Sequence, residues 1–315
     1  MAGNRLPGGE GAPEAEAAAG PAAGGRPGGI GGGARAVAPG LHFIATPIGA
    51  ARDITLRALD ILAAAEVLAA EDTRTLRHLM EIHGIPLGGR PLLAYHDHNG
   101  AAMRPRLLRE LAEGRSVAYA SEAGTPLVAD PGFQLGRAAI ADGHPVFAAP
   151  GPSAVLAALT VSGLPTDRFL FAGFPPAAAG ARARFLREMA AIPATTVFYE
   201  APTRIDRLLR EMADTFGEMR QAAVCRELTK RFEEVRRGSL GDLAEAFAGG
   251  TKGEIVVVVD RASAVVVAEE ELEMHLRDAL AQMRVRDAAA LVSEKLGLPR
   301  RQVYQAALRL TGEET

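Results

Sequence analysis

Short apolar runs alternate along residues 41–163 with segments whose apolar residues recur at helical spacing. Leu56, Leu59 and Leu62, for example, share one face of a predicted helix. Strands that alternate with helices of this length predict an α/β fold with a mostly parallel sheet covered on both faces. The expected strands are 42–45, 67–70, 92–95, 115–120 and 145–148, and the expected helices are 55–65, 75–83, 103–113, 133–142 and 153–162.

The pattern breaks at residues 163–167, Gly-Leu-Pro-Thr-Asp, which we interpret as a linker to a second α/β unit. Val256–Val259 is continuously apolar, as expected of a central buried strand. The other expected strands are 168–172, 195–199 and 221–226, the strand around Val256 runs over 254–260, and the expected helices are 181–191 and 205–215.

Residues 270–312 form a third predicted unit. Two amphipathic segments, 286–296 and 300–309, are separated by Gly297 and Pro299, which is typical of a helix-turn-helix. Residues 1–40 lack periodicity and large apolar side chains, so we expect a disordered extension. The predicted organisation is therefore an extension at 1–40, α/β domains at 41–163 and 164–262, and a helical unit at 270–312.

Composition narrows the class of protein. The chain of 315 residues is 48% hydrophobic and 23% charged, which is ordinary for a globular enzyme. Its net charge of −3 means that contact with a polyanion depends on local basic patches. The single cysteine, Cys225, excludes an internal disulfide framework and fits a reducing cytoplasm. No apolar run is long enough to span a membrane, so a cytoplasmic location is expected.

Three turns rich in glycine and proline carry the strongest functional signal. They lie at 45–49, 121–132 and 149–154, each between a predicted strand and a predicted helix. In open α/β sheets a ligand lies against the main chain at such positions. One such turn alone would fit a tight connection equally well. Because neither a dinucleotide fingerprint nor a phosphate loop is present, a nucleoside-like ligand without phosphates is expected.

Longer motifs accompany these turns: Thr46-Pro47-Ile48-Gly49, Ala70-Glu71-Asp72-Thr73-Arg74, Tyr95-His96-Asp97-His98-Asn99, Gly124-Thr125-Pro126, Pro150-Gly151-Pro152-Ser153-Ala154, Phe198-Tyr199-Glu200-Ala201-Pro202 and Arg226-Glu227-Leu228-Thr229-Lys230. In wording and order they resemble the ribosomal RNA small-subunit methyltransferase I family over roughly residues 41–310. The chain departs from the family pattern at Glu122, where aspartate is usual, at Thr203, and at the lysine-free segment 177–181.

The resemblance implies a tetrapyrrole-methylase-like fold of two α/β domains with S-adenosylmethionine in the cleft between them. It also implies 2′-O-methylation of a cytidine ribose in the decoding region of 16S ribosomal RNA, by a homodimer. The donor contacts that it implies are Pro47, Ile48, Gly49, Ser121, Glu122, Ala123, Gly124, Thr125, Val128, Pro152, Ser153, Ala154, Tyr199 and Leu228.

Methylation of a ribose hydroxyl requires that the hydroxyl be oriented in line with the methyl group and partly deprotonated. The candidates for the base or orienting group, unranked, are Asp72, His96, Glu200 and Glu227. Asp72 has an alternative reading as a helix N-cap. His96 and His98 have the spacing of metal ligands, but no third ligand is evident. Since the sulfonium is already activated, we expect no metal.

The predicted RNA contacts are basic residues from several segments: Arg74, Arg182, Arg184, Arg226, Lys230, Arg300 and Arg301. Phosphate contacts of this kind make binding salt-dependent. The alternatives are a solvated basic face for the string that runs from Arg226 to Arg237, and a packing or dimer-stabilising role for the helical unit. Two competing functions remain: a tetrapyrrole C-methyltransferase and a non-catalytic nucleic-acid-binding protein. The helix-turn-helix pattern and the intact glycine turns favour an RNA methyltransferase.

Overall fold

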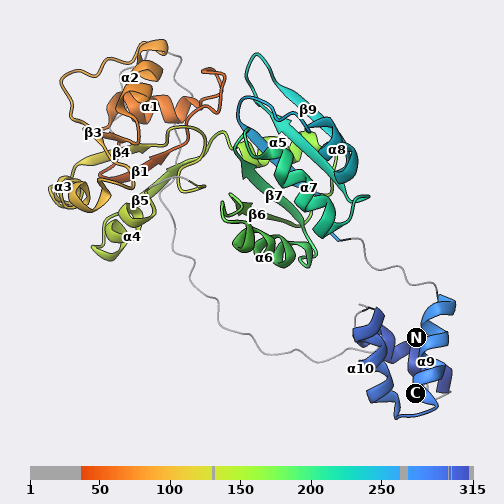
Figure 1. Cartoon of the computed structure of the whole chain (residues 1–315). Coiled ribbons are helices and arrows are strands. Elements are labelled where there is room, and N and C mark those ends of the chain that lie inside the picture. The colour runs from red at the N-terminus through yellow and green to blue at the C-terminus, as the bar shows by residue number, and fades with distance from the viewer. Residues whose placement is uncertain (1–36, 130–131, 263–268, 297, 299, 312–315) are drawn as a thin grey trace, which may run out of the picture. The chain divides into compact units, whose positions relative to one another are not determined.

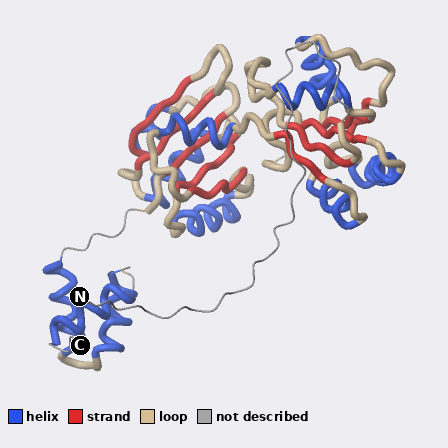
Figure 2. Tube along the Cα trace, turned by 180° about the vertical axis from the view of Figure 1, so that it is seen from behind, coloured by secondary structure: helices blue, strands red, loops and turns tan. Residues whose placement is uncertain are grey.

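The computed structural model describes residues 37–129, 132–262, 269–296, 298 and 300–311. Residues 1–36, which make up nearly all of the expected extension, lie outside this range, as do Gly297 and Pro299. Figure 1 shows two α/β units followed by a helical unit. Figure 2 separates the strands of the two sheets from the helices around them.

The first sheet has five parallel strands in the order β3-β2-β4-β1-β5. Their bounds are β1 Gly40–Ile44, β2 Val67–Ala70, β3 Leu92–Ala94, β4 Ser116–Ala120 and β5 Val146–Ala149. The sequence prediction of a parallel sheet is confirmed for this unit. Because all strands are parallel, their carboxyl ends meet at one edge of the sheet, where the turns 45–49 and 121–125 begin.

Helices cover both faces of the first sheet. Their bounds are α1 Leu56–Ala64, α2 Thr73–Ile82, α3 Gly100–Ala112 and α4 Phe133–Ala141. Phe43 packs in a core with residues of α3 and α4, whereas its neighbour Ile44 packs in a second core with residues of α1 and α2. Successive residues of a strand point to opposite faces, so the buried runs read as continuously apolar in the sequence.

The second sheet is mixed, with the order β6-β7-β10-β8-β9. Its bounds are β6 Phe169–Gly173, β7 Thr195–Glu200, β8 Gln221–Arg226, β9 Glu234–Ser239 and β10 Ile255–Val259. Only β6 and β7 pair in parallel, and β10 is the central, fully buried strand, as the sequence predicts. The sequence analysis missed β9 and the helix α8, Leu240–Ala246, which follows it.

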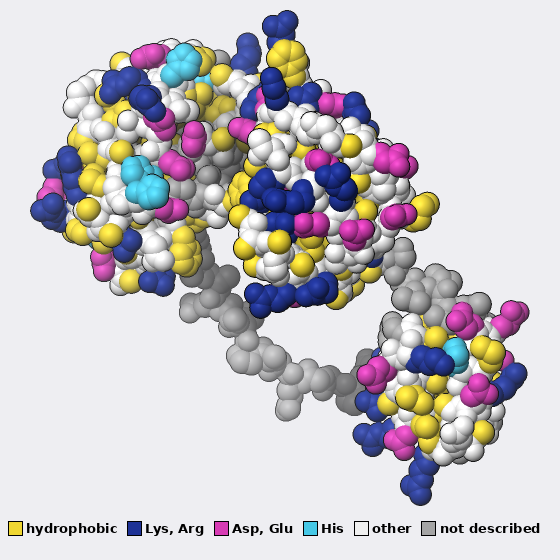
Figure 3. Space-filling model, in the orientation of Figure 1, with side chains coloured by type: hydrophobic (Ala, Val, Ile, Leu, Met, Phe, Trp, Pro, Cys, Tyr) yellow, Lys and Arg dark blue, Asp and Glu magenta, His cyan; other side chains and the backbone are white. Residues whose placement is uncertain are grey.

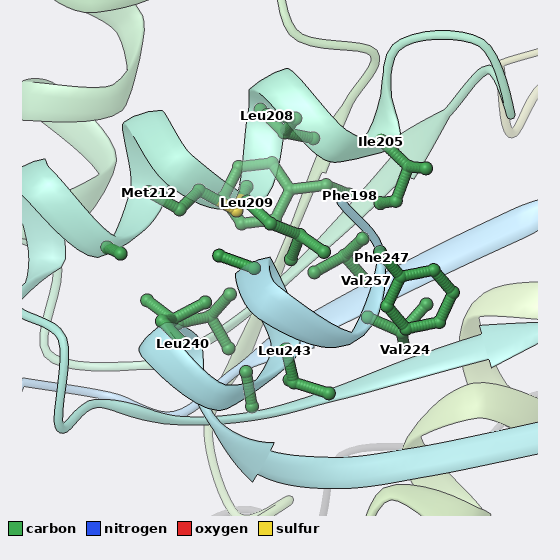
Figure 4. Packing of buried hydrophobic residues seen from close by; sticks show 14 of the residues in the cluster. Phe198, Ile205, Leu208, Leu209, Met212, Val224, Leu240, Leu243, Phe247 and Val257 are labelled. Atoms are coloured by element: carbon green, nitrogen blue, oxygen red, sulfur yellow. The ribbon is translucent and has the colours of Figure 1, made fainter. Parts of the chain in front are cut away.

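Helices α6, Ala179–Ala190, and α7, Ile205–Phe216, cover one face of this sheet together with α8. Figure 4 shows Leu208, Leu209 and Met212 of α7 facing Leu240 and Leu243 of α8, in one cluster with the strand residues Val224 and Val257. These side chains form one continuous buried cluster, which holds α7 and α8 against the strands of the second sheet.

The opposite face of the second sheet is covered by α5, Ala154–Ser162. Val155, Ala158 and Leu159 of this helix are buried against Ala223 and Val256 of the strands. The helix precedes the linker predicted at residues 163–167, yet it packs on the sheet that follows this linker. The core of the second α/β unit therefore begins before residue 163.

The C-terminal unit contains three helices, α9 Glu269–Leu280, α10 Val285–Leu296 and α11 Arg300–Thr311. Leu276, Ala288, Val292 and Val303 are buried in a core that belongs to these helices alone. The helix-turn-helix pair predicted from the sequence corresponds to α10 and α11, and α9 completes the core. Within the described residues, none of the helices has the length and apolar character needed to cross a lipid bilayer.

Candidate active site

The three glycine and proline turns are joined to one another by hydrogen bonds. Thr46 and Gly124 exchange two backbone hydrogen bonds, each with an N···O distance of 3.0 Å. The Oγ1 of Thr46 also lies 3.2 Å from the Oγ of Ser121. The hydroxyl of Thr125 donates to the carbonyl oxygen of Pro152 over 2.9 Å. The turns that looked independent in the sequence therefore form one scaffold.

Two glycines of this scaffold leave little room for a side chain. Gly124 has a φ of +81°, and a Cβ placed on it would lie 3.2 Å from Cγ2 of Ile48. A Cβ on Gly151 would lie 2.9 Å from the Cβ of Ala45. Leu127 and Ala129 adopt left-handed φ values of 70° and 61°, which are strained for residues with a side chain. Such strain is typical of a segment whose conformation serves a ligand.

A cavity of about 380 Å³ opens beside the scaffold, which is enough space for a small ligand. Of the predicted donor contacts, those that line the cavity are Ile48, Glu122, Ala123, Gly124, Thr125, Val128, Ser153, Ala154, Tyr199 and Leu228. Those that do not line it are Pro47, Gly49, Ser121 and Pro152. Ser121 and Pro152 bond to the scaffold, and Gly49 packs tightly against Thr229 and Lys230. Their direct contact with a donor stays a prediction.

Six residues of the cavity wall were not predicted from the sequence, namely Ala129, Phe174, Cys225, Glu254, Ile255 and Val256. Several of these residues come from the strands β8 and β10, where nothing in the local sequence separates a pocket residue from a core residue. Ile48, Cys225 and Val256 are buried, so the inner wall is apolar. Burial raises the pKa of the Cys225 thiol to about 11, and the thiol is therefore neutral at physiological pH.

An acidic cluster lies at the same edge of the first sheet. Glu71 follows β2, while His96 and Asp97 follow β3, and Glu122 follows β4. Burial raises the pKa of the Glu71 carboxyl, and the charges of Glu122 and Asp97 raise it further, whereas His96 lowers it. Glu122 also lines the cavity. Glu71 is thus a carboxylate with increased basicity next to the site, although the sequence analysis selected its neighbour Asp72.

Asp72 has a structural role, and its alternative reading as a helix cap is confirmed. It is the N-cap of α2, and its Oδ1 accepts a hydrogen bond from the backbone N of Arg74 over 2.7 Å. The side chain of Arg74 donates to both carboxylate oxygens. These hydrogen bonds hold the pKa of Asp72 below its usual range, which makes it a weak base.

Glu200 and Arg182 are buried and engaged in ion pairs, which does not favour their predicted roles in catalysis and in RNA binding, and these roles stay predictions. Glu200 is 3% exposed, and its oxygens bind Arg204 over 2.7 and 3.0 Å. Arg182 is 2% exposed, binds Glu211 through two hydrogen bonds of 2.6 and 2.7 Å, and donates to two backbone carbonyls. Neither side chain has a free face for a substrate.

Glu227 is also engaged. It has a left-handed φ of 51°, and its Oε1 accepts from the backbone N of Glu254 over 2.9 Å and from the Nζ of Lys230 over 3.1 Å. The backbone donor of Glu254 and then the Lys230 ammonium hold the pKa of Glu227 below its usual range. A carboxylate stabilised in this way is a poor proton acceptor, and it fixes the loop that carries Leu228 into the cavity.

The other predicted basic contacts differ in their availability. Lys230 pairs with Glu227 and Glu254, and Arg226 pairs with Glu234. The side chain of Arg74 is 91% exposed despite its pairing with Asp72. The solvent-exposed group consists of Arg184 on α6 and of Arg300 and Arg301 at the start of α11.

Arg300 and Arg301 line a shallow hollow on the C-terminal unit together with Arg286 and Tyr304. Figure 3 shows basic side chains on this unit and on the second α/β unit. His96 and His98 lie with ring centroids 6.0 Å apart, but no group of three metal-ligating side chains occurs in the part of the chain that the structure describes. The expectation of a metal-free site stays a prediction.

Comparison with known proteins decides the family. Residues 40–244 match the family described as Tetrapyrrole (Corrin/Porphyrin) Methylases, and residues 266–311 match the RsmI C-terminal HTH domain. Ribosomal RNA small subunit methyltransferase I of Mesorhizobium japonicum is 46% identical over 279 residues, which cover 88% of this chain and 94% of that protein. The chain belongs to this family.

A second member of the small subunit methyltransferase I family, from Xylella fastidiosa, is 44% identical and covers 84% of this chain and 97% of its own length. Among solved structures, a cobalt precorrin-4 methyltransferase superposes with a TM-score of 0.53 at 18% identity, over 70% of this chain and 94% of that one. That similarity concerns the fold alone.

Family membership makes the chain an S-adenosylmethionine-dependent methyltransferase, as the resemblance implied. The residues present fit this donor. The apolar inner wall of the cavity suits the adenine ring and the methylene groups of the donor. The glycine at position 124 lets the ligand approach the main chain closely, where a larger residue would be strained.

Proposed function

We propose that this protein methylates the 2′-oxygen of a cytidine ribose in the decoding region of 16S ribosomal RNA. The observation that carries the proposal is the cavity at the joined turns, which has the basic carboxylate Glu71 close to its lining residue Glu122. The names of the relatives and the match to a helix-turn-helix domain support ribosomal RNA as the substrate.

The chemistry needs a hydroxyl that is held and deprotonated beside an activated methyl group. S-adenosylmethionine supplies that methyl group on its sulfonium. The scaffold around Gly124 holds the donor, and the Glu71 carboxylate accepts the proton of the ribose hydroxyl as the oxygen–carbon bond forms and the carbon–sulfur bond breaks. A base with a pKa raised toward neutrality suits this step better than Asp72 or Glu227, whose pKa values are lowered.

RNA binding is assigned to the exposed basic residues, Arg74, Arg184, Arg300 and Arg301. Arg226 and Lys230 remain candidates that must exchange their present carboxylate partners for phosphates. Action on ribosomal RNA places the protein in the cytoplasm, and a homodimer would present two helical units to the RNA. Each phosphate contact makes affinity fall with rising salt.

The decisive experiment incubates unmethylated 16S ribosomal RNA, free or in the small subunit, with the protein and the donor. Mass spectrometry of nuclease fragments is expected to locate one additional 2′-O-methylcytidine. Methylation of a tetrapyrrole but of no RNA would refute the proposal and favour the competing function.

Gly124→Val provides the matched test of the donor site. Its side chain would enter the space beside Ile48 on a backbone with a left-handed φ. We expect calorimetry to detect no donor binding and mass spectrometry to find no methylated product, while circular dichroism stays unchanged. Gly180→Ala is the control, because a Cβ at that position meets no atom within 4 Å. Donor affinity that equals the wild-type value in Gly124→Val would contradict the assignment of the cavity.

A further inference from the structure

Phe174 is a large aromatic side chain left exposed at the active-site cavity. It directly follows β6, lines the cavity, and is 57% exposed. Its ring meets Tyr199 edge to face at a centroid distance of 5.5 Å, and Tyr199 meets Phe171 in the same way at 4.8 Å. Full burial of a phenylalanine contributes about 1.5–3 kcal/mol to stability, and this side chain gives up a large part of that contribution.

The loop that carries Phe174 is held by two arginines, of which Arg182 is buried and Arg204 is partly exposed. Arg204 donates to the carbonyl oxygen of Pro175 over 2.7 Å. Arg182 donates to the carbonyl oxygens of Pro176 and Ala177 over 3.1 and 2.7 Å. The three consecutive carbonyls after Phe174 are therefore all fixed, and two of them belong to prolines, whose φ is already restricted.

Each arginine is in turn oriented by a carboxylate that contacts it twice. Glu200 binds Arg204, and Glu211 binds Arg182. One member of each pair, Arg182 or Glu200, is buried, and because removing a charged group from water is costly, such pairs contribute geometry more reliably than stability. We call these four residues the loop clamp. The loop clamp thus fixes the short loop 174–177, while the aromatic ring of Phe174 in this loop stays exposed.

The surroundings of Phe174 indicate what its ring meets. The inner wall of the cavity is formed by Ile48, Leu228 and Val256, all nearly inaccessible to solvent. The exposed lining residues include Phe174 and two glutamates, Glu122 and Glu254. Glu254 is paired with Lys230, whereas the Glu122 carboxylate repels phosphate, so we expect a base or a sugar rather than the RNA backbone to enter past Glu122. The enclosed inner part is left for the methyl donor.

From this arrangement we infer that Phe174 is the stacking platform for the target base of the RNA, and that the loop clamp positions it. The inference rests on the proposed function. An enzyme that modifies one nucleotide unstacks it from its neighbours, and an aromatic side chain replaces the lost stacking. Stacking on an aromatic residue contributes about 1–3 kcal/mol per base. A rigid platform aligns the ribose with the methyl group.

Phe174→Ala tests the platform. We expect the KM for RNA to rise roughly 5- to 150-fold, which corresponds to the loss of one stacked base, while the calorimetric affinity for S-adenosylmethionine is unchanged. Phe174→Trp is expected to restore the KM, because it keeps a stacking face. The matched control is Phe133→Ala, which removes a ring that is 60% exposed at the start of α4, away from the cavity lining.

A direct readout uses an RNA fragment with a fluorescent cytidine analogue at the target position. The wild-type protein is expected to change its emission through stacking, and Phe174→Ala is not. Equal weakening of donor binding and RNA binding in Phe174→Ala would mean that the ring stacks on the adenine of the donor, and an unchanged KM for RNA would exclude the platform altogether. If the wild-type protein methylates no RNA at all, the proposed function fails instead.

Arg204→Lys tests the clamp, since lysine keeps the charge but cannot bind Glu200 through a planar fork and reach Pro175 as well. We expect a rise in the KM for RNA with little change in kcat at saturating RNA. Adding Phe174→Ala should raise the KM no further, because both changes remove the same interaction. Additive effects, or a lowered melting temperature with an unchanged KM, would show that the arginine supports only the fold.

Discussion

Glu71 shows how the position of a single residue sets its chemistry. It is half-buried between segments that carry like charges, so its folded-state pKa lies above the value in the unfolded chain. At neutral pH the carboxylate therefore destabilises the native state, and this cost is absent below the ordinary pKa of glutamate. A group kept at this cost next to a donor cavity is a reasonable proton acceptor.

We expect Glu71→Gln to melt at a higher temperature than the wild type at pH 7. The difference should shrink as the pH falls through the raised pKa and vanish below the ordinary range for glutamate, because both proteins are then uncharged at this position. Methyl transfer should drop by roughly 10²- to 10⁴-fold, the usual contribution of a general base, while donor affinity stays the same.

Glu188→Gln is the control for this prediction, since Glu188 is an exposed carboxylate on α6, away from the cavity lining. Differential scanning calorimetry across pH 4–8 measures the stability, and single-turnover assays measure the transfer. A variant that is less stable than the wild type at pH 7, or one that keeps full activity, would remove Glu71 from the mechanism.

At the scale of elements, α8 depends on its N-cap, Ser239, which precedes its first residue. The Oγ of Ser239 accepts a hydrogen bond from the backbone N of Asp242 over 3.1 Å, and the Asp242 carboxylate accepts one from the backbone N of Ser239 over 3.3 Å. This capping box begins a helix of only 7 residues that covers part of the second sheet. A short helix has little intrinsic stability without such a cap.

Ser239→Ala should lower the free energy of unfolding by about 1 kcal/mol, as measured by urea denaturation. Ser239→Thr keeps the hydroxyl and should stay within a few tenths of a kcal/mol of the wild type. If alanine and threonine are equally tolerated, α8 is held by its packing on the sheet and not by its cap.

The sequence predicts those elements whose apolar pattern is strong. The central strand β10 is a continuous apolar run, and its position in the sheet follows from that pattern. The missed strand β9 reads Glu-Val-Arg-Arg-Gly-Ser and lies at the edge, paired only with β8, so burial leaves little trace in its sequence. Edge strands are commonly rich in charge, which hides them from a search for apolar runs.

The site follows the same rule. The glycine turns are visible in the sequence because the backbone itself requires glycine and proline there. The partner of Arg182, by contrast, is Glu211, 29 residues further on, and only folding shows that the two saturate each other. The raised pKa of Glu71 likewise depends on burial and then on Glu122, which follows β4 and is distant in sequence.

At the scale of the whole molecule, the C-terminal unit has a core of its own, while the donor cavity is lined by residues from Ile48 to Val256. Truncation after Asp260 should therefore leave donor affinity unchanged. It removes the hollow formed by Arg286, Arg300, Arg301 and Tyr304, so RNA affinity should fall and depend less steeply on salt.

Filter binding of a ribosomal RNA fragment at several salt concentrations measures both effects. In the full-length protein, the double variant Arg300→Ala, Arg301→Ala should make RNA affinity fall less steeply with salt concentration. The decrease in slope should correspond to the loss of about two phosphate contacts. RNA affinity that is the same before and after truncation would leave the helical unit with a purely structural role.

The packing of α5 has a consequence for the order in which the chain is made. All five strands of the first sheet have left the ribosome once Ala149 is exposed, whereas the strands that α5 covers are complete only at Val259. At about 5–20 residues per second this interval lasts on the order of ten seconds. During this time α5, which has almost no polar side chains, has emerged from the ribosome before the sheet that it covers is complete. Synthesis that stops between these points should leave a folded first unit followed by the exposed apolar helix α5, which chaperones and proteases would bind.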